Sequence, residues 1–317
     1  NSASSIDVPT NLEKVKKKNI IVAIIDSGID FNHEILKNNI YVPQKHPLLP
    51  LKFQNKKLSK DFYGFDFSKK EMTSTPVDNH GHGTHIAGII KSVYSDAQFL
   101  ILKYFDPALS GEANLQASLE ALNFAVNCEE VDIINISGGG QGSSAQEKAL
   151  IEIAKKKGKL VIVAAGNEKL DIDNAKNSFY PASYNLDNII SVNAYDQNLE
   201  LIGQSSWGKK TVHISAPGQR IKSTMKGNSL AYLAGTSQAT AFVSGVAALI
   251  KSIYPQATYQ LIKEAIIKSA DKIASLENKT VSGGKLNASK SLAYVANILN
   301  PLTLNRTIAQ AHIAGKK

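Results

Sequence analysis

The sequence has one cysteine among its 317 residues, Cys128. A disulfide within the chain needs two cysteines and a cysteine-based zinc site needs more, so both are excluded. Long apolar runs are missing as well, because runs such as Ile20–Ile25 have the length of a strand rather than of a membrane span. Packing of side chains must therefore hold the fold together.

Positive charge is in modest excess, and it is not concentrated in one segment of the chain. The chain carries 36 Lys and Arg against 27 Asp and Glu, a formal net charge of +9. The positive residues are mostly lysines spread along the chain, and the run Lys14, Lys16, Lys17, Lys18 is interpreted as a solvated face. A nucleic-acid binder driven by this charge is an alternative that no motif supports, and we expect no nucleic-acid partner.

The composition is that of an ordinary globular protein, with 43% hydrophobic and 20% charged residues. Short β-branched runs alternate with longer amphipathic segments, which predicts a three-layer α/β/α fold with a mainly parallel central sheet. The predicted strands are Ile20–Ile25, Gln98–Tyr104, Asp132–Ile136, Leu160–Ala164, Ile189–Val192 and Val212–Ile214. The predicted helices are Leu115–Val126, Ala145–Lys156, Ala239–Ile253, Tyr259–Ser269 and Ala288–Ile298.

No repeat or linker divides the chain, so we expect a single domain over residues 1–317. Within it, about residues 1–18 are expected to form an N-terminal arm and about residues 305–317 a polar C-terminal tail. The segment Asn38–Asp78 has several prolines, many lysines and no sustained period. It is predicted to be a long excursion over the surface.

Two polar features lie where sites commonly form. Asp26 comes at the end of an apolar strand and precedes Ser27-Gly28, and the carboxyl ends of parallel strands are where sites of open α/β sheets collect. A simple turn cap is the alternative role for Asp26. The second feature is His80–His85, which leads into an apolar helix; glycines flank His82, a position suited to proton transfer near neutral pH.

The histidines of this motif also suggest a metal site. His82 and His85 are three residues apart and can share a helix face, but the glutamate of the zinc-peptidase pattern is missing and no third ligand is evident. We therefore expect no metal there.

Ser237 lies within Gly235–Thr240, at the start of the helix predicted for Ala239–Ile253. Small neighbours leave its hydroxyl accessible, and the helix dipole favours negative charge there, although an N-cap serine is the simpler alternative. Asn167 follows the strand Leu160–Ala164 with an amide that can donate, or it only forms a loop. Serine, histidine, carboxylate and oxyanion donor are the components of nucleophilic acyl transfer.

At this point the motifs resemble those of the subtilisin-like serine peptidases, the subtilases. The aspartate, histidine, oxyanion and serine motifs of that family resemble, in the family's order, Ile25–Asp30, Gly81–Gly88, Ala164–Asn167 and Gly235–Thr240. The resemblance covers about residues 20–296. It implies a subtilisin-like fold and a serine endopeptidase that hydrolyses extended protein or peptide substrates through an acyl-enzyme.

The resemblance also implies roles for individual residues. Asp26 would orient His82, which would act as general base and then as general acid. Ser237 would be the nucleophile, and Asn167 would stabilise the oxyanion with the Ser237 backbone amide. His85 would be a structural residue of the same helix.

The family binds its substrate as an extended strand between two backbone segments. Here the resemblance implies Ser110–Glu112 and Ser137–Gly139 as those segments, and an S1 pocket walled by Ser137–Gly140 and Ala164–Asn167. Glu168 would lie near the pocket base and tolerate a basic P1 residue; Phe179, where a glycine is common, would make the pocket shallower and favour small or medium P1 residues. The expected substrate-binding residues are Ser110, Gly111, Ser137, Gly138, Gly139, Ala164, Gly166, Glu168 and Phe179.

Calcium is treated separately, since many members of the family hold it in a loop after the histidine helix. Here Ile89–Ala97 runs almost directly into the next strand, and Ile35 falls near the place of the family's carboxylate ligand. We therefore expect the strong calcium site to be absent, leave a weaker one open, and expect no organic cofactor.

The resemblance further implies a secreted or periplasmic zymogen whose N-terminal propeptide inhibits it, and we expect a monomer without a membrane span. Two alternatives stay open. One is a catalytically silent subtilisin-like fold that binds a partner peptide. The other is an esterase or peptide ligase, which uses the same acyl-enzyme.

Overall fold

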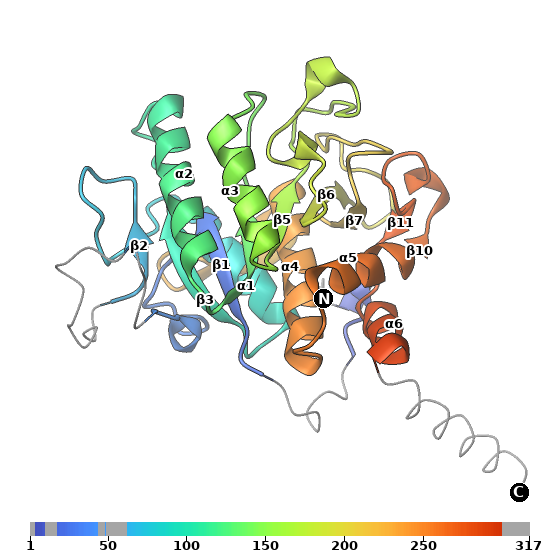
Figure 1. The fold of residues 1–317 in the computed structure, drawn as a ribbon, viewed down its shortest axis with the longest axis horizontal. Coiled ribbons are helices and arrows are strands. Elements are labelled where there is room, and N and C mark those ends of the chain that lie inside the picture. The colour runs from blue at the N-terminus through green and yellow to red at the C-terminus, as the bar shows by residue number, and fades with distance from the viewer. Residues whose placement is uncertain (1–3, 10–17, 44–47, 49–61, 300–317) are drawn as a thin grey trace, which may run out of the picture.

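A nine-stranded sheet forms the centre of the computed structural model, which describes residues 4–9, 18–43, 48 and 62–299 (Figure 1). The strands are β1 (Ile21–Asp26), β2 (Phe65–Asp66), β3 (Gln98–Lys103), β4 (Val131–Ile136), β5 (Leu160–Ala164), β6 (Ile189–Tyr195), β7 (Ile214–Pro217), β10 (Asp271–Lys272) and β11 (Gly284–Lys285). Their order is β10-β11-β7-β6-β5-β4-β1-β3-β2. All neighbours pair in parallel except β10 and β11, so the predicted mainly parallel sheet is confirmed.

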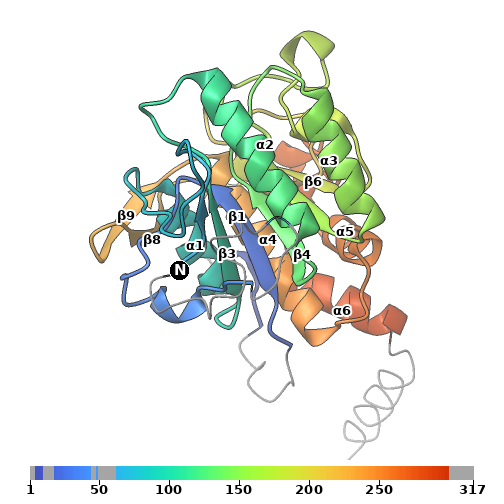
Figure 2. The ribbon, with the colours of Figure 1, turned by 60° about the vertical axis from the view of Figure 1, so that its left-hand side comes forward.

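Helices cover both faces of this sheet (Figures 1 and 2). On one face lie α2 (Gly111–Asn127) and α3 (Ala145–Lys156). On the other lie α1 (His82–Val93) and α4 (Thr236–Ile253), with α5 (Tyr259–Lys268) and α6 (Ala288–Leu299) beside α4. The three-layer α/β/α fold expected from the sequence is therefore present.

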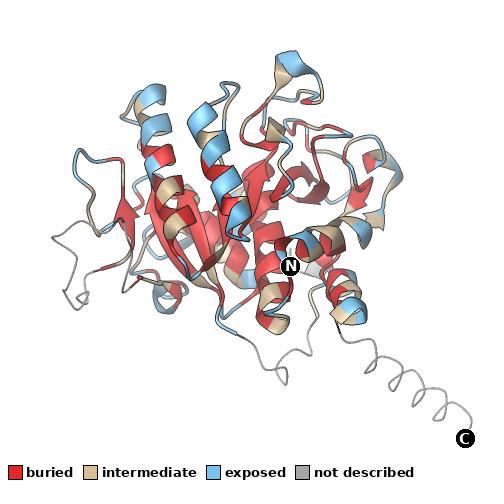
Figure 3. Ribbon diagram, viewed as in Figure 1, coloured by how far each residue is buried: buried red, intermediate tan, exposed pale blue. Residues whose placement is uncertain are grey.

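Each face of the sheet has its own hydrophobic core. Ile24 belongs to the core under α1 and α4, and Ile25 to the core under α2 and α3, because successive strand residues point to opposite faces. Burial is concentrated in the strands and in α4, whereas α2 and α3 expose their outer sides (Figure 3). In the core under α1 and α4 these two helices approach closely at Gly245, because a Cβ atom there would lie 2.6 Å from Val93 Cβ.

Some predicted boundaries agree with the structure, and the starts of two helices differ. Ala145–Lys156 and Leu160–Ala164 have the predicted bounds. However, α2 begins at Gly111 rather than Leu115, because the Ser110 side chain accepts a hydrogen bond from Ala113 N and caps the helix there. The helix α4 begins at Thr236 rather than Ala239 and so includes Ser237, although its N-cap residue, Gly235, has no side chain to cap it.

The segment Asn38–Asp78 is more than the predicted surface excursion. Phe65 is fully buried, and its ring centroid lies 4.3 Å from that of Phe124 in the core under α2. The strand β2 also pairs with β3 at the edge of the sheet. The described part of this segment thus contributes to the core, which a two-residue strand without sequence periodicity does not reveal.

The two ends of the chain differ in what is described. In the predicted N-terminal arm, Ile6 is buried in the core under α4, and Asp7 O accepts a hydrogen bond from Ser289 N at 3.1 Å. The predicted C-terminal tail, residues 305–317, lies outside the described residues. Within the described ranges, every helix is too short or too polar to cross a bilayer.

Candidate active site

Asp26 and His82 form a hydrogen-bonded pair between β1 and α1. Asp26 is the last residue of β1 and only 5% exposed, and its Oδ1 lies 2.8 Å from Nδ1 of His82, the first residue of α1. The helix can start this close to β1 because residue 83 is glycine: a Cβ atom there would lie 2.2 Å from the Gly28 carbonyl oxygen. Since a carboxylate only accepts, His82 carries a proton on Nδ1, and Nε2 of the neutral ring is left as an acceptor.

The surroundings of His82 favour its charged form. Burial works to lower the pKa of His82, but the charge of Asp26, the hydrogen bond to Asp26 and the charge of Asp78 act in the opposite direction. The net result is a pKa raised above the ordinary value of histidine. The Asp26 carboxylate is therefore placed to stabilise an imidazolium at this position.

Asp78 joins the turn after β1 to the first turn of α1, a role that the sequence analysis missed. It is 4% exposed, and its Oδ1 accepts hydrogen bonds from Ser27 Oγ at 2.9 Å and from Gly81 N at 2.6 Å. Its Oδ2 accepts from Thr84 N at 2.9 Å. An acidic residue just ahead of a predicted helix is the signal that could have identified it.

Ser237 lies in the first turn of α4 and is 8% exposed. Its hydroxyl donates to the Ser137 carbonyl oxygen at 2.8 Å, and the Ser137 hydroxyl donates to the Ser237 carbonyl oxygen at 3.2 Å. Among the hydrogen bonds of the described residues there is none between Ser237 and His82. The structure therefore brings the serine against the expected substrate-binding segment Ser137–Gly139, with its hydroxyl turned to Ser137.

Asn167 is fixed beside the start of α4 through one atom of its amide. Its Oδ1 accepts from Thr236 N at 2.9 Å and from Thr236 Oγ1 at 3.3 Å. The amide oxygen is thereby occupied, which leaves the Nδ2 group of Asn167 as a free donor next to Ser237. The turn that carries Asn167 leaves β5 through Gly166, whose φ is +100°.

His85 has a different environment from His82. Its ring is fully buried, and Nε2 is 3.1 Å from the Ile221 carbonyl oxygen and 3.2 Å from that of Ala231. These carbonyls belong to a hairpin of β8 (Ile221–Met225) and β9 (Ser229–Leu233) that the sequence analysis did not predict. Burial lowers the pKa of His85 to about 4.

Within the described part of the chain, no three His, Cys, Asp or Glu side chains gather as a metal ion would require. The helix α1 continues to Val93, and Tyr94–Ala97 leads straight into β3. The expectations on calcium stay predictions.

The two expected substrate-binding segments differ in conformation. Ser137–Gly139 follows β4 directly, and a Cβ atom on Gly138 would lie 2.5 Å from the Tyr104 hydroxyl oxygen. In the other segment only Ser110 keeps an extended backbone, with φ −64° and ψ 160°, because Gly111 and Glu112 already belong to α2. The start of α2 therefore shortens the extended part of that segment.

Phe179 lies against two of the expected pocket glycines. A Cβ atom on Gly139 would be 2.6 Å from Phe179 Cε1, and one on Gly166 would be 3.0 Å from Cδ2. The Glu168 carboxylate lies on the same side, since a Cβ atom on Gly166 would be 2.3 Å from its Oε2. Ala164 ends β5 next to these residues. The structure thus brings Gly139 and Gly166, one glycine from each expected wall of the S1 pocket, against the Phe179 ring.

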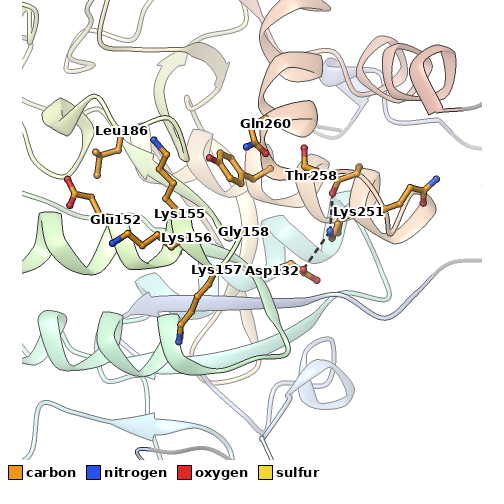
Figure 4. A pocket seen from close by; sticks show the side chains of 13 residues that line it. Asp132, Glu152, Lys155, Lys156, Lys157, Gly158, Leu186, Lys251, Thr258 and Gln260 are labelled. Carbon is orange, nitrogen blue, oxygen red and sulfur yellow. Dashed lines mark hydrogen bonds and ion pairs between the residues drawn. The ribbon is translucent and has the colours of Figure 1, made fainter.

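A cleft of about 760 Å³ lies away from these residues, at the edge of the sheet where the parallel strands begin (Figure 4). It is bordered by lysines from α3 and α4 and by the start of α5, and Asp132 lines it near the beginning of β4. Two of its lysines lie beside carboxylates: Lys155 pairs with Asp187 at 2.5 Å, and Lys251 lies 3.8 Å from Asp132. None of the site residues expected from the sequence lines this cleft.

Comparison with known proteins identifies the family of the chain. Residues 17–292 match the model of the Subtilase family. The major intracellular serine protease of Bacillus subtilis (strain 168) is 34% identical over 255 residues, which cover 78% of this chain and 72% of that protein. Thermitase of Thermoactinomyces vulgaris is 32% identical over 284 residues, covering 86% and 88%.

Some relatives are much longer. Subtilisin-like protease 2 of Plasmodium falciparum (isolate 3D7) is 31% identical over 290 residues, which cover 86% of this chain and 20% of that protein. The chain thus spans about a fifth of the length of that relative. Because the family model matches most of the chain, this protein belongs to the subtilase family of subtilisin-like serine peptidases.

Proposed function

We propose that the protein is a serine endopeptidase that hydrolyses peptide bonds of extended protein or peptide substrates. The observation that carries the proposal is the 2.8 Å contact between Asp26 and His82, made where β1 meets α1. Ser237 and the free amide donor of Asn167 lie together at the start of α4, which packs beside α1. A nucleophile, a base with its orienting carboxylate and an oxyanion donor are thus available in one region.

In the proposed reaction the Ser237 hydroxyl leaves the Ser137 carbonyl and donates to His82 Nε2. Ser237 Oγ then attacks the substrate carbonyl carbon while His82 takes its proton. The resulting oxyanion accepts hydrogen bonds from Asn167 Nδ2 and the Ser237 backbone amide. The C–N bond breaks as His82 gives its proton to the leaving amine, and water repeats the sequence to release the acid.

Substrate is proposed to bind as an added strand along Ser137–Gly139 and Ser110, with its P1 side chain near Phe179. The ring of Phe179 between Gly139 and Gly166 supports a shallow pocket that favours small or medium side chains. Glu168, at the same place, would accept a basic one. We further propose that the acyl-enzyme transfers its acyl group to water, as in a peptidase, rather than to an amine, as in a peptide ligase.

Location, maturation and oligomeric state rest on the family resemblance. We propose a secreted or periplasmic monomer made as a zymogen with an inhibitory propeptide, without an organic cofactor and without the strong calcium site. One relative is itself named an intracellular protease, so fractionation of cells that make this protein is the direct test of location.

The proposed function is tested by treating the folded chain with a fluorophosphonate and measuring its intact mass. The reagent reacts with a serine whose proton a neighbouring base removes, so we expect one adduct, mapped by digestion to Ser237. The heat-denatured chain is the control and should remain unlabelled. Absence of an adduct on the folded chain would reject the peptidase and favour a subtilisin-like fold that only binds peptides.

Asn167→Ala is expected to lower kcat by about a hundredfold or more with little change in KM, because a donor is lost that acts on the oxyanion of the transition state. Steady-state kinetics on a fluorogenic peptide measure both constants. Asn278→Ala, at an exposed asparagine whose side-chain oxygen accepts a hydrogen bond from Lys209, is the control.

A second variant separates this role from a structural one. Asn167→Asp keeps an acceptor for Thr236 N but offers no donor to the oxyanion, so it should be at least as slow as Asn167→Ala. If Asn167→Asp retained the kcat of the unchanged protein, the oxyanion role of Asn167 would be wrong.

A further inference from the structure

A cavity of about 360 Å³ lies beside the proposed substrate strand, between β1, β4 and the helices α2 and α3. Most of its wall is apolar or aromatic, with contributions from Leu115, Leu122, Ile136 and Tyr180. Gly138 and Gly139, part of the segment proposed to pair with the substrate backbone, form one side. A peptide bound along this segment would therefore pass the opening of the cavity.

The cavity is separate from the reacting bond. No residue of α1 or α4, the helices that carry His82 and Ser237, is among its lining residues in the described chain. Phe179 and Glu168, which surround the expected S1 pocket, do not line it either. Since side chains of an extended peptide alternate between two sides, the cavity receives a substrate side chain other than P1. We assign the proposed strand partners Ser110 and Ser137–Gly139 to the acyl side of the substrate, so this residue lies N-terminal to P1.

Glu147 places a carboxylate in this wall. It lies in the first turn of α3, where its backbone N–H donates to the side chain of the N-cap residue Ser144 at 3.2 Å. In a capping box, a glutamate here would return its carboxylate to the backbone N–H of the N-cap residue. That N–H donates instead to the Tyr184 hydroxyl at 2.8 Å. The Glu147 carboxylate is therefore not needed to cap α3.

The carboxylate has no cation opposite it. Among the described residues that line the cavity there is no lysine, arginine or histidine, and Glu147 is the one acidic side chain. Its environment penalises charge, since burial raises the pKa of the Glu147 carboxyl, while a hydrogen bond with Tyr184 opposes that rise. A half-buried carboxylate without a counter-charge is stabilised by a cationic group that enters the cavity.

We propose that Glu147 makes this cavity select a substrate residue with a long aliphatic stem and a terminal cation, lysine or arginine. The inference rests on the proposed peptidase function. The methylene groups of such a residue would pack on Leu115, Leu122 and Ile136, and its ammonium or guanidinium group would pair with Glu147. An aliphatic residue of equal length would fill the same space but leave the carboxylate without a counter-charge, which is the basis for discrimination.

The test uses fluorogenic tetrapeptides with a fixed P1 residue, in which lysine and norleucine are exchanged at each of P2, P3 and P4 in turn. We expect kcat/KM to favour lysine over norleucine about tenfold or more at one position, the size of a charge-assisted hydrogen bond. Glu147→Gln should bring that ratio close to one while the norleucine peptide is cleaved as well as before. Glu152→Gln, an exposed glutamate on the same helix, is the matched control and should keep the ratio.

Binding to Ser237→Ala separates this inference from the proposed function. Dissociation constants of the lysine and norleucine peptides for this variant, with and without Glu147→Gln, measure the same ratio without catalysis. Failure of fluorophosphonate labelling would reject the peptidase but leave the binding ratio to be measured. A ratio near one at every position, or a lysine preference that survives Glu147→Gln, would overturn the role of Glu147.

Discussion

Ser237→Ala is expected to lower kcat by about a millionfold, the loss typical of removing the nucleophile from such a unit. The variant removes the atom that would form the acyl-enzyme, and the remaining activity would come from Asn167 and substrate binding alone. It also removes the hydrogen bond from Ser237 Oγ to Ser137 O, which joins two buried residues. One such bond contributes about 1 kcal/mol, so the variant should still fold, with a small decrease in its unfolding temperature.

Single-turnover kinetics with excess enzyme can measure so slow a reaction. Ser95→Ala, at an exposed serine in the connection from α1 to β3, serves as the control and should keep full activity. If Ser237→Ala kept more than about a hundredth of the original kcat, another group would have to be the nucleophile.

Asp26→Asn is expected to lower kcat by about ten-thousandfold. An asparagine can still accept the hydrogen bond from Ser27 N, so the turn is preserved. However, it has no charge with which to stabilise the imidazolium of His82, and its amide can hold the ring in the wrong tautomer. Asp187→Asn, in an exposed pair with Lys155, makes the same change away from the site and is the control.

The same variant should shift the pH dependence of kcat/KM. His82 acts as a base only when neutral, and its raised pKa means that activity rises with pH through a midpoint above the ordinary value of histidine. Removing the charge of Asp26 lowers the pKa of His82, so the midpoint should move to lower pH. A profile with an unchanged midpoint would show that Asp26 does not face the catalytic base.

The layers of the fold could be predicted because long strands and helices carry a sequence period. The strand β5 and the helix α3 illustrate this, since both have the predicted bounds. Short elements have no period: β2 contains two residues, and its burial depends on Phe124, which is far along the chain. The hairpin of β8 and β9 is similar, because its outer strand is largely exposed and it is held by contacts with α1 such as those of His85.

The candidate site was predictable to the extent that its chemistry lies in short motifs. Asp26, His82, Asn167 and Ser237 each stand at the end of a strand or the start of a helix, which local sequence indicates. Asp78 and Glu147 could not be assigned in this way. The partners of Asp78 belong to two separate segments, and Glu147 faces the cavity because Tyr184, from another part of the chain, takes over its capping partner.

The hydrogen bond between Ser27 and Asp78 affects which changes in the length of the segment between β1 and α1 the site can tolerate. The two ends of the segment between β1 and α1 are fastened to each other, by Ser27 Oγ to Asp78 at 2.9 Å and by Ile29 N to Pro76 O at 2.9 Å. The entropy of closing a loop grows only with the logarithm of its length. Insertions or deletions between these fastened ends therefore leave Asp26 and His82 in register, provided that they spare Phe65 and β2, which belong to the core and the sheet.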